Sequence, residues 1–399
     1  MKGETKSGVI EKIQMALSGN MRQYGMVVAL FVVVLFFQVM TRGILLMPLN
    51  VSNIIQQNAY VMILACGMML CILTGGRIDL SVGSVAGFVG AVSAVFVLRM
   101  GIPTPLAIFL SLLIGLAIGC WHGFWIAYVG VPAFIATLAG LLVFRGLTMA
   151  ILQGVSLAPM PRNYQFLGSG FITDTRGIGG LMTITIVVAV IACIVLIVMQ
   201  ILARRKRKSY GFHVPHIALF LTQLTIVCGV IMFLALRLAQ HRGIPMVLVI
   251  VSGLVLLYSF ITNYTVFGRR IYALGGNSTA ARLSGINTRR ILFLVYANMG
   301  LLAALAGIVF TGRLNSATPK AGDGFELDAI AACFIGGAST TGGVGTIVGA
   351  IIGSMMMGVL NNGMAIMGVS IDWQQAIKGM VLLVAVAFDV FSRRNRTTA

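Results

Sequence analysis

The chain carries few charged residues, and acidic residues are the scarcest of them. Charged side chains make up 9% of its 399 residues, and only 9 residues are acidic against 28 that are basic. About a quarter of the residues in soluble domains are charged, so this composition excludes an ordinary soluble protein. Hydrophobic residues reach 59%. Runs of roughly 20 apolar residues, each long enough to cross a bilayer as a helix, recur along nearly the whole chain.

Motifs of catalysis and of cofactor binding are missing as well. The sequence contains no Ser/His/Asp order, no zinc-type His-Glu pattern, no paired carboxylates and no dinucleotide fingerprint. A glycine-rich string at 329–345 has no GxxxxGK[ST] pattern, which argues against a phosphate-binding loop. The cysteines lie in apolar segments without a CxxC or a Cys/His cluster, so they indicate neither disulfides nor a metal site. We therefore expect no catalytic residue, no cofactor and no metal.

The apolar runs and the basic residues together predict the architecture. Backbone groups in lipid must be hydrogen-bonded within the protein, which favours helices. We predict an all-α, polytopic transmembrane bundle with about 12 spans. Basic residues show a more than twofold excess in the connections on one side, which places both termini in the cytoplasm. The predicted parts are a cytoplasmic segment at 1–23, a transmembrane domain at 24–392 and a cytoplasmic tail at 393–399.

One polar stretch, Phe267–Arg290, separates two of the apolar runs and lies within a predicted cytoplasmic loop at 265–290. Gly275 and Gly276 free the backbone there, and either Asn277 or Ser278 can cap a short helix. Gly285 then ends this helix of about two turns. Five arginines and no acidic residue accompany the helix. Such a helix is either an ordinary surface loop or a contact for a partner.

Polar residues inside or beside the other spans form a second set of candidates. Gln56, Gln57 and Asn58 face either a neighbouring helix or a pathway, because amides in lipid need partners. Asp79 follows a Gly-Gly turn, and it forms either a structural ion pair with Arg77 or part of a transport site. The candidates for a pathway or a packing motif are Gln56, Gln57, Asn58, Asp79, Ser81 and Asn298.

Four ordered motifs resemble the permeases of ABC importers for ribose, xylose and galactose. They are Gly-Gly-x-Ile-Asp-Leu-Ser-Val-Gly from Gly75, the Val-Pro, Phe-Ile-x-Thr-Leu and Arg-Gly pattern at 130–147, Gly-Gly-Asn-x-x-Ala-Ala-Arg-Leu-Ser-Gly-Ile from Gly275, and a Gly-Gly-x-Ser turn within 329–345. An apparent insertion of a helical pair near 203–244 is typical of the xylose or multiple-monosaccharide branch. The chain departs from the family at Ser278 and Thr279, where an acidic residue usually precedes the paired alanines.

The resemblance implies a function, a location and a set of partners. It implies a permease subunit in the bacterial cytoplasmic membrane that moves a monosaccharide, with ATP hydrolysed on a separate subunit. The helix at 277–285 then docks on the ATPase, through residues that include Gly275, Gly276, Asn277, Ala280, Ala281, Arg282, Ser284 and Gly285. The implied partners are a dimer of ATP-binding subunits, an extracytoplasmic sugar-binding protein, a second copy of the permease and membrane lipids, without nucleic acid.

The alternative is an ion-coupled secondary transporter of small polar solutes. Such transporters place ionisable residues near the middle of the bilayer. Here only Arg145 and Lys378 fall inside predicted spans, without a carboxylate. Asp323, Glu326 and Asp328 are assigned to a solvated external loop, which could meet basic residues of a binding protein. This distribution favours energy from ATP.

Overall fold

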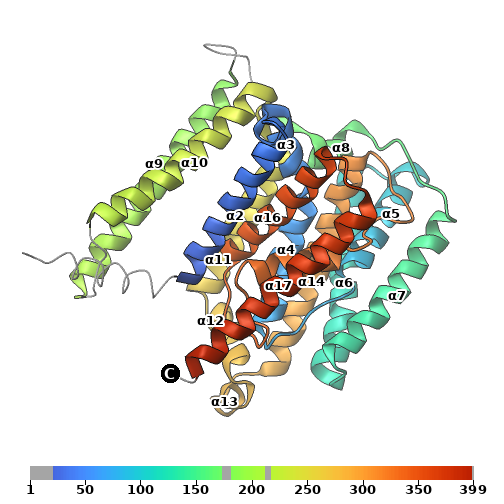
Figure 1. Ribbon diagram of the computed structural model, residues 1–399. Helices are drawn as coiled ribbons and strands as arrows, with labels where there is room; N and C mark the ends of the chain where they lie inside the picture. Colours follow the sequence, from blue (N-terminus) through green and yellow to red (C-terminus); the bar gives the residue numbers. More distant parts are fainter. Residues whose placement is uncertain (1–20, 173–180, 212–216, 398–399) are drawn as a thin grey trace, which may run out of the picture.

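The computed structural model describes residues 21–172, 181–211 and 217–397. These residues are almost entirely helical (Figure 1). The first half contains α2 (Met21–Met40), a 3-10 turn (Ile44–Leu46), α3 (Pro48–Gln57), α4 (Ala59–Leu73), α5 (Val82–Leu98), α6 (Thr104–Phe124) with a π-helical extension (Trp125–Val129), α7 (Ala133–Leu152) and α8 (Arg162–Ser169). The second half contains α9 (Thr183–Ser209), α10 (Ile217–His241), α11 (Met246–Tyr264), α12 (Val266–Gly276), α13 (Ser278–Leu283), α14 (Thr288–Leu314), α15 (Phe325–Ile335), α16 (Ile347–Ile366) and α17 (Ile371–Thr397). Two short strands, β1 (Phe171–Ile172) and β2 (Ile244–Pro245), pair antiparallel.

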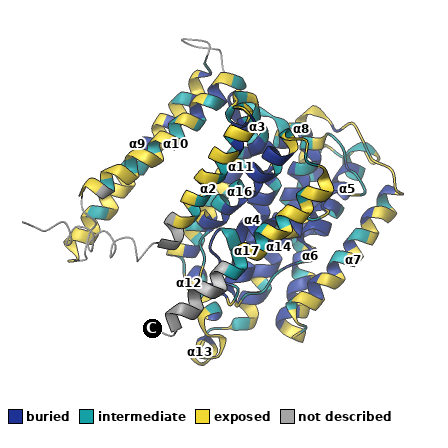
Figure 2. Ribbon diagram, viewed as in Figure 1, coloured by how far each residue is buried: buried dark blue, intermediate teal, exposed yellow. Residues whose placement is uncertain are grey.

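The core is built around α14, which packs against α4, α5 and α6. Small residues let these backbones approach closely. A Cβ on Gly307 would lie 2.1 Å from the carbonyl oxygen of Ala86, and one on Gly300 would lie 2.3 Å from that of Gly115. The inner helices are buried while α7, α9 and α10 expose apolar side chains (Figure 2). An apolar exterior around a buried core fits a surrounding bilayer.

The described residues form a polytopic helical membrane protein, as predicted. Seven helices are long and apolar enough to cross a membrane, and the bent pair α3–α4 raises that number to eight. The two helices of this pair meet at 42°, at the polar residues Gln56 to Asn58. Helix α5 is among the shorter apolar helices. Its 17 residues fall short of the roughly 20 that a straight crossing requires.

Helix α10 does not pack closely along α11, the next helix in the sequence. Helix α10 packs along α9 and against α3 instead, and the α9–α10 pair lies to one side of the other helices (Figure 1). β1 and β2 join this region to the bundle, since Ile172 pairs with Ile244. The connection between α7 and α9 contains α8, which packs on α14, and residues 173–180 of this connection lie outside the described part.

The assignment of the acidic residues after α14 to a solvated loop is wrong for two of the three. Glu326 is 8% exposed and Asp328 is 4% exposed, because both lie in the first turn of the buried helix α15. Asp328 accepts hydrogen bonds from Lys378 of α17 at 3.0 Å and from the Tyr60 hydroxyl at 2.9 Å. A partner cation and a hydroxyl donor offset the cost of burying this carboxylate. Asp323 stays exposed.

The second predicted cation, Arg145 of α7, also has a partner. Its guanidinium lies 3.1 Å from a carboxylate oxygen of Asp323. The two cations inside predicted spans are therefore bound to carboxylates, Arg145 to Asp323 and Lys378 to Asp328.

Candidate functional site

Three glycine-rich stretches that are far apart in the sequence meet at one end of the bundle. They are the α4–α5 connection (74–81), the helices α12 and α13, and the α15–α16 connection (336–346). The backbone N–H of Gly343 donates to the carbonyl of Leu73 at 3.1 Å, and the Tyr272 hydroxyl of α12 donates to the carbonyl of Gly345 at 2.8 Å. The three motifs thus form one packed unit rather than separate loops.

Glycine is required where these stretches touch. A Cβ on Gly275, in the last turn of α12, would lie 1.8 Å from the carbonyl oxygen of Leu73 and 2.5 Å from the amide nitrogen of Gly343. A Cβ on Gly76 would lie 2.0 Å from the carbonyl oxygen of Thr340. By contrast, a Cβ on Gly276 would have no atom within 4 Å. The expectation that Gly275 and Gly276 serve to free the backbone is therefore wrong for Gly275, whose role is close packing.

Helix α13 has the ends that the sequence predicts. The side chain of Asn277, not that of Ser278, accepts a hydrogen bond from the Ala280 N–H at 2.9 Å and caps the helix. At the other end Gly285 adopts a φ of 82°, and the N–H of Ile286 donates to the carbonyl of Ala281 at 3.1 Å. This is a Schellman-type ending, for which glycine is favoured by its positive φ.

Most of α13 is exposed. Ala281 is the buried residue of this short helix, at 5% exposure. The other proposed coupling residues on it, Ala280, Arg282, Ser284 and Gly285, are exposed. Leu283 was not among the predicted site residues, yet it is 81% exposed. A single exposed leucine is ordinary on a protein surface, so the feature that suits α13 to a protein contact is the exposure of five of its six residues.

Helix α12 connects the exposed helix to the core, and sequence reasoning missed it. Its first turn is capped by Thr265, whose hydroxyl accepts a hydrogen bond from the Gly268 N–H at 3.2 Å. Ile271 and Leu274 are buried on its inner side. Burial raises the pKa of the Tyr272 hydroxyl, which keeps it a neutral donor toward Gly345. The signal that could have found α12 is the spacing of Phe267, Ile271 and Leu274.

The Asp79 motif forms a local turn and not the ion pair that was one of its two interpretations. Asp79 is 3% exposed and accepts hydrogen bonds from the hydroxyl of Ser81 at 2.6 Å and from its backbone N–H at 2.8 Å. The guanidinium of Arg77 donates to the carbonyl of Thr74 instead. Asp79 and Ser81 therefore fix the start of α5.

The polar residues at the bend between α3 and α4 divide into two groups. Asn58 donates to the carbonyl of Ser354, and Gln56 donates to that of Ser169 at 3.3 Å, so both bind neighbouring helices. Gln57 is exposed.

Asn298 of α14 accepts a hydrogen bond from the Tyr258 hydroxyl, while its buried side-chain nitrogen has no partner among the described residues. The predicted pathway residues are thus not brought together at one site.

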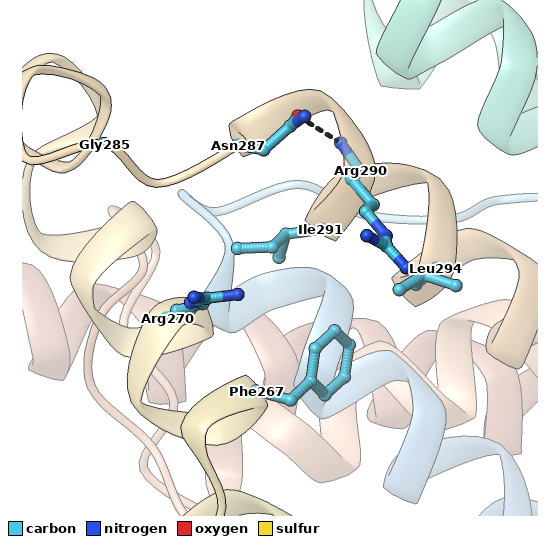
Figure 3. Close-up of a pocket in the computed structure, with 7 residues that line it drawn as sticks. All are labelled: Phe267, Arg270, Gly285, Asn287, Arg290, Ile291 and Leu294. Carbon is cyan, nitrogen blue, oxygen red and sulfur yellow. Dashed lines mark hydrogen bonds between the residues drawn. The ribbon is translucent and has the colours of Figure 1, made fainter.

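A pocket of about 420 Å³ lies beside α13, between α12 and the first turns of α14 (Figure 3). Phe267 and Arg270 line it from α12, and Arg290, Ile291 and Leu294 line it from α14. Gly285 and Asn287 complete the wall, and the Asn287 side chain caps α14 by accepting from the Arg290 N–H at 3.0 Å. The pocket is therefore apolar at its base with two guanidinium groups at its sides.

The buried helical core, the apolar exterior and the exposed helix α13 define a multi-pass membrane protein with a surface open to a partner. The family model described as branched-chain amino acid transport system / permease component matches residues 50–386, and the chain belongs to this family. It is a permease subunit of the ABC importer type in the inner membrane, with ATP hydrolysis on a separate subunit.

Relatives of similar length are named as permeases for sugars. The chain is 38% identical to the xylose transport system permease protein XylH of Escherichia coli K12 over 94% of this chain and 93% of the relative. It is 37% identical to XylH of Haemophilus influenzae over 95% and 98%, and 37% identical to the ribose import permease protein RbsC of Escherichia coli K12 over 85% of each. No solved structure matches the chain.

Proposed function

We propose that this chain is the permease of an ATP-driven importer for a monosaccharide, of the xylose or related pentose and hexose type. Support comes from the two groups of relatives, which are named for xylose and for ribose and match at 37–38% identity over most of their length. The transported sugar would be delivered by an extracytoplasmic sugar-binding protein, and two permease copies would assemble with two ATP-binding subunits.

The proposed topology has twelve crossings with both termini in the cytoplasm. Beyond the seven long helices and the bent pair, this count adds α2, α5, α17 and the segment formed by α15 with its following loop. An even number of crossings and the basic residues at 204–208 and 269–290 support this orientation. The segment 1–23 would precede the transmembrane domain at 24–392, and 393–399 would form a short tail. The helical pair near 203–244 would then be an insertion.

The contact between α12 and the two glycine-rich connections carries the proposal of coupling. Gly275 touches Leu73 at the end of α4 and Gly343 in the α15–α16 connection, so α12 cannot move without moving both. Closure of the ATP-binding subunits would push α13. Helix α12 would pass this motion to α4 and α15, and the bundle would alternate its access. The coupling residues are those named for the 275–285 segment.

The six candidate pathway residues divide into those that hold helix ends and those that could contact the sugar. Asn58, Asp79 and Ser81 are engaged in internal hydrogen bonds, which favours a role in holding the helix ends. Gln57 is exposed, and the side-chain nitrogen of Asn298 has no hydrogen-bond partner among the described residues. They are the candidates for contact with a sugar hydroxyl as it passes.

The test is reconstitution of the permease with its ATP-binding subunit and binding protein in vesicles. Arg282→Ala and Gly285→Val should each lower sugar uptake per ATP hydrolysed while leaving the amount of inserted permease unchanged. Valine at a φ of 82° is strained, because its branched side chain disfavours that conformation. Normal transport by both variants would refute the coupling role. Uptake that follows an ion gradient and ignores ATP would instead establish a secondary transporter.

A further inference from the structure

The pocket beside α13 has positive charge without any compensating acid. Arg270 and Arg290 lie on opposite sides of it, one on α12 and one on α14 (Figure 3). Both residues are exposed. In the described part of the chain, ion pairs join Arg145 to Asp323 and Lys378 to Asp328, and neither arginine of the pocket takes part in one. The two guanidinium groups are therefore available to a ligand.

The rest of the pocket favours an anionic group carried on a carbon chain. Ile291 is 4% exposed and Leu294 is 40% exposed, and together with Phe267 they form an apolar wall between the two arginines. The 27-residue helix α14 begins at the pocket, and its N-terminal dipole adds a positive potential. A carboxylate accepts a bidentate hydrogen bond from a guanidinium, with its methylene groups against the apolar wall.

We infer that this pocket receives an acidic side chain, Asp or Glu, of the ATP-binding subunit, so that Arg270 and Arg290 form a second contact beside the helix α13. The inference rests on the proposed function. Gly285 belongs both to the end of α13 and to the pocket wall, so a subunit docked on the exposed residues of α13 lies next to the pocket. The whole stretch from 265 to 290 contains five arginines and no acidic residue. Charge complementarity therefore requires acids on the partner.

Neighbouring arginines provide a matched control. Arg269 and Arg289 each stand one residue from a pocket arginine, are also exposed, and do not line the pocket. The pocket pair Arg270→Glu/Arg290→Glu and the flanking pair Arg269→Glu/Arg289→Glu change the charge of the same segment by the same amount. Both variants should elute like the wild-type permease in gel filtration.

The experiment measures the dissociation constant of the ATP-binding subunit for the permease in nanodiscs of phosphatidylcholine, with and without phosphatidylglycerol. The pocket pair should weaken binding by about tenfold or more relative to the flanking pair. Equal loss in both pairs, or no loss in either, would overturn the pocket contact and leave the proposed function standing. Failure of the wild-type permease to bind the ATP-binding subunit would refute both. Normal binding of the subunit by the pocket pair, with loss of retained phosphatidylglycerol, would identify a lipid headgroup as the occupant.

A second measurement does not depend on the charge variants. Leu294→p-benzoylphenylalanine places a photoreactive group in the pocket of an otherwise unchanged permease. Irradiation of the assembled importer should join this residue to a segment of the ATP-binding subunit that contains Asp or Glu. A cross-link to lipid alone would overturn the inference.

Discussion

The substitution Gly275→Ala tests whether α12 is held against the core by direct backbone contact. The added Cβ would lie 1.8 Å from the carbonyl oxygen of Leu73, where an ordinary contact begins at 3.4 Å. Helix α12 and the end of α4 must therefore separate by about 1.6 Å. Both nearest atoms belong to backbone, in Leu73 and Gly343, so no flexible side chain can move aside. Overpacking of this kind lowers the free energy of unfolding by about 1–3 kcal/mol.

The neighbouring variant Gly276→Ala is the control for the change in helix propensity. It adds the same methyl group to the same helical turn with no atom within 4 Å, and alanine is favoured over glycine inside a helix. Denaturation of the purified permease in detergent, followed by tryptophan fluorescence, measures the stability of each variant. Sugar uptake per ATP hydrolysed measures coupling. Gly275→Ala should be the less stable and the less coupled of the two. Equal stability and coupling in both variants would refute a rigid contact between α12 and α4.

Three further predictions follow from single contacts. Asn277→Ala removes the cap of α13 and should destabilise this helix by about 1 kcal/mol, which is measured as faster hydrogen exchange in the 280–283 segment. Ser278→Ala should leave the exchange rate unchanged, because Asn277 is the capping residue. Equal exchange rates in the two variants would argue against the cap. Lys378→Met leaves the buried carboxylate of Asp328 without its cation and should lower the free energy of unfolding by on the order of 3 kcal/mol. Adding Asp328→Asn should restore part of this loss. A Lys378→Met variant as stable as the wild type would show that the ion pair contributes nothing to stability. Tyr272→Phe removes a hydrogen bond of 2.8 Å to a backbone carbonyl and should lower the free energy of unfolding by about 1 kcal/mol in the same denaturation assay. An unchanged midpoint of denaturation would mean that water replaces the lost donor.

Local features were predicted well because they depend on neighbouring residues. A cap at Asn277 or Ser278 and a stop at Gly285 follow from side-chain hydrogen bonding and from the φ that glycine permits, and the structure has the cap at Asn277 and the stop at Gly285. The helical membrane class followed from apolar runs. The exposed position of Leu283 was missed because it has no strong local signal, whereas helix α12 was missed although Phe267, Ile271 and Leu274 are spaced as on one face of a helix.

Features that depend on distant partners were predicted poorly. Glu326 and Asp328 were assigned to solvent because carboxylates are rarely buried, and the partner that permits burial of Asp328 lies 50 residues away at Lys378. The ion pair between Asp79 and Arg77 was a natural expectation for neighbouring opposite charges. The structure uses the nearer donors of Ser81 instead.

The amino-acid sequence by itself determined that this protein is a helical membrane protein, because apolar segments long enough to cross the bilayer satisfy their backbone hydrogen bonds there as helices. It also determined the end of α13 at Gly285 and narrowed its capping residue to Asn277 or Ser278. Only the tertiary structure decided the role of the three glycine-rich motifs. In the sequence, a glycine that frees the backbone cannot be told from one that allows a distant segment of the same chain to pack against it. Gly275 meets Leu73 and Gly343, two residues from different ends of the chain, and only packing could bring them together.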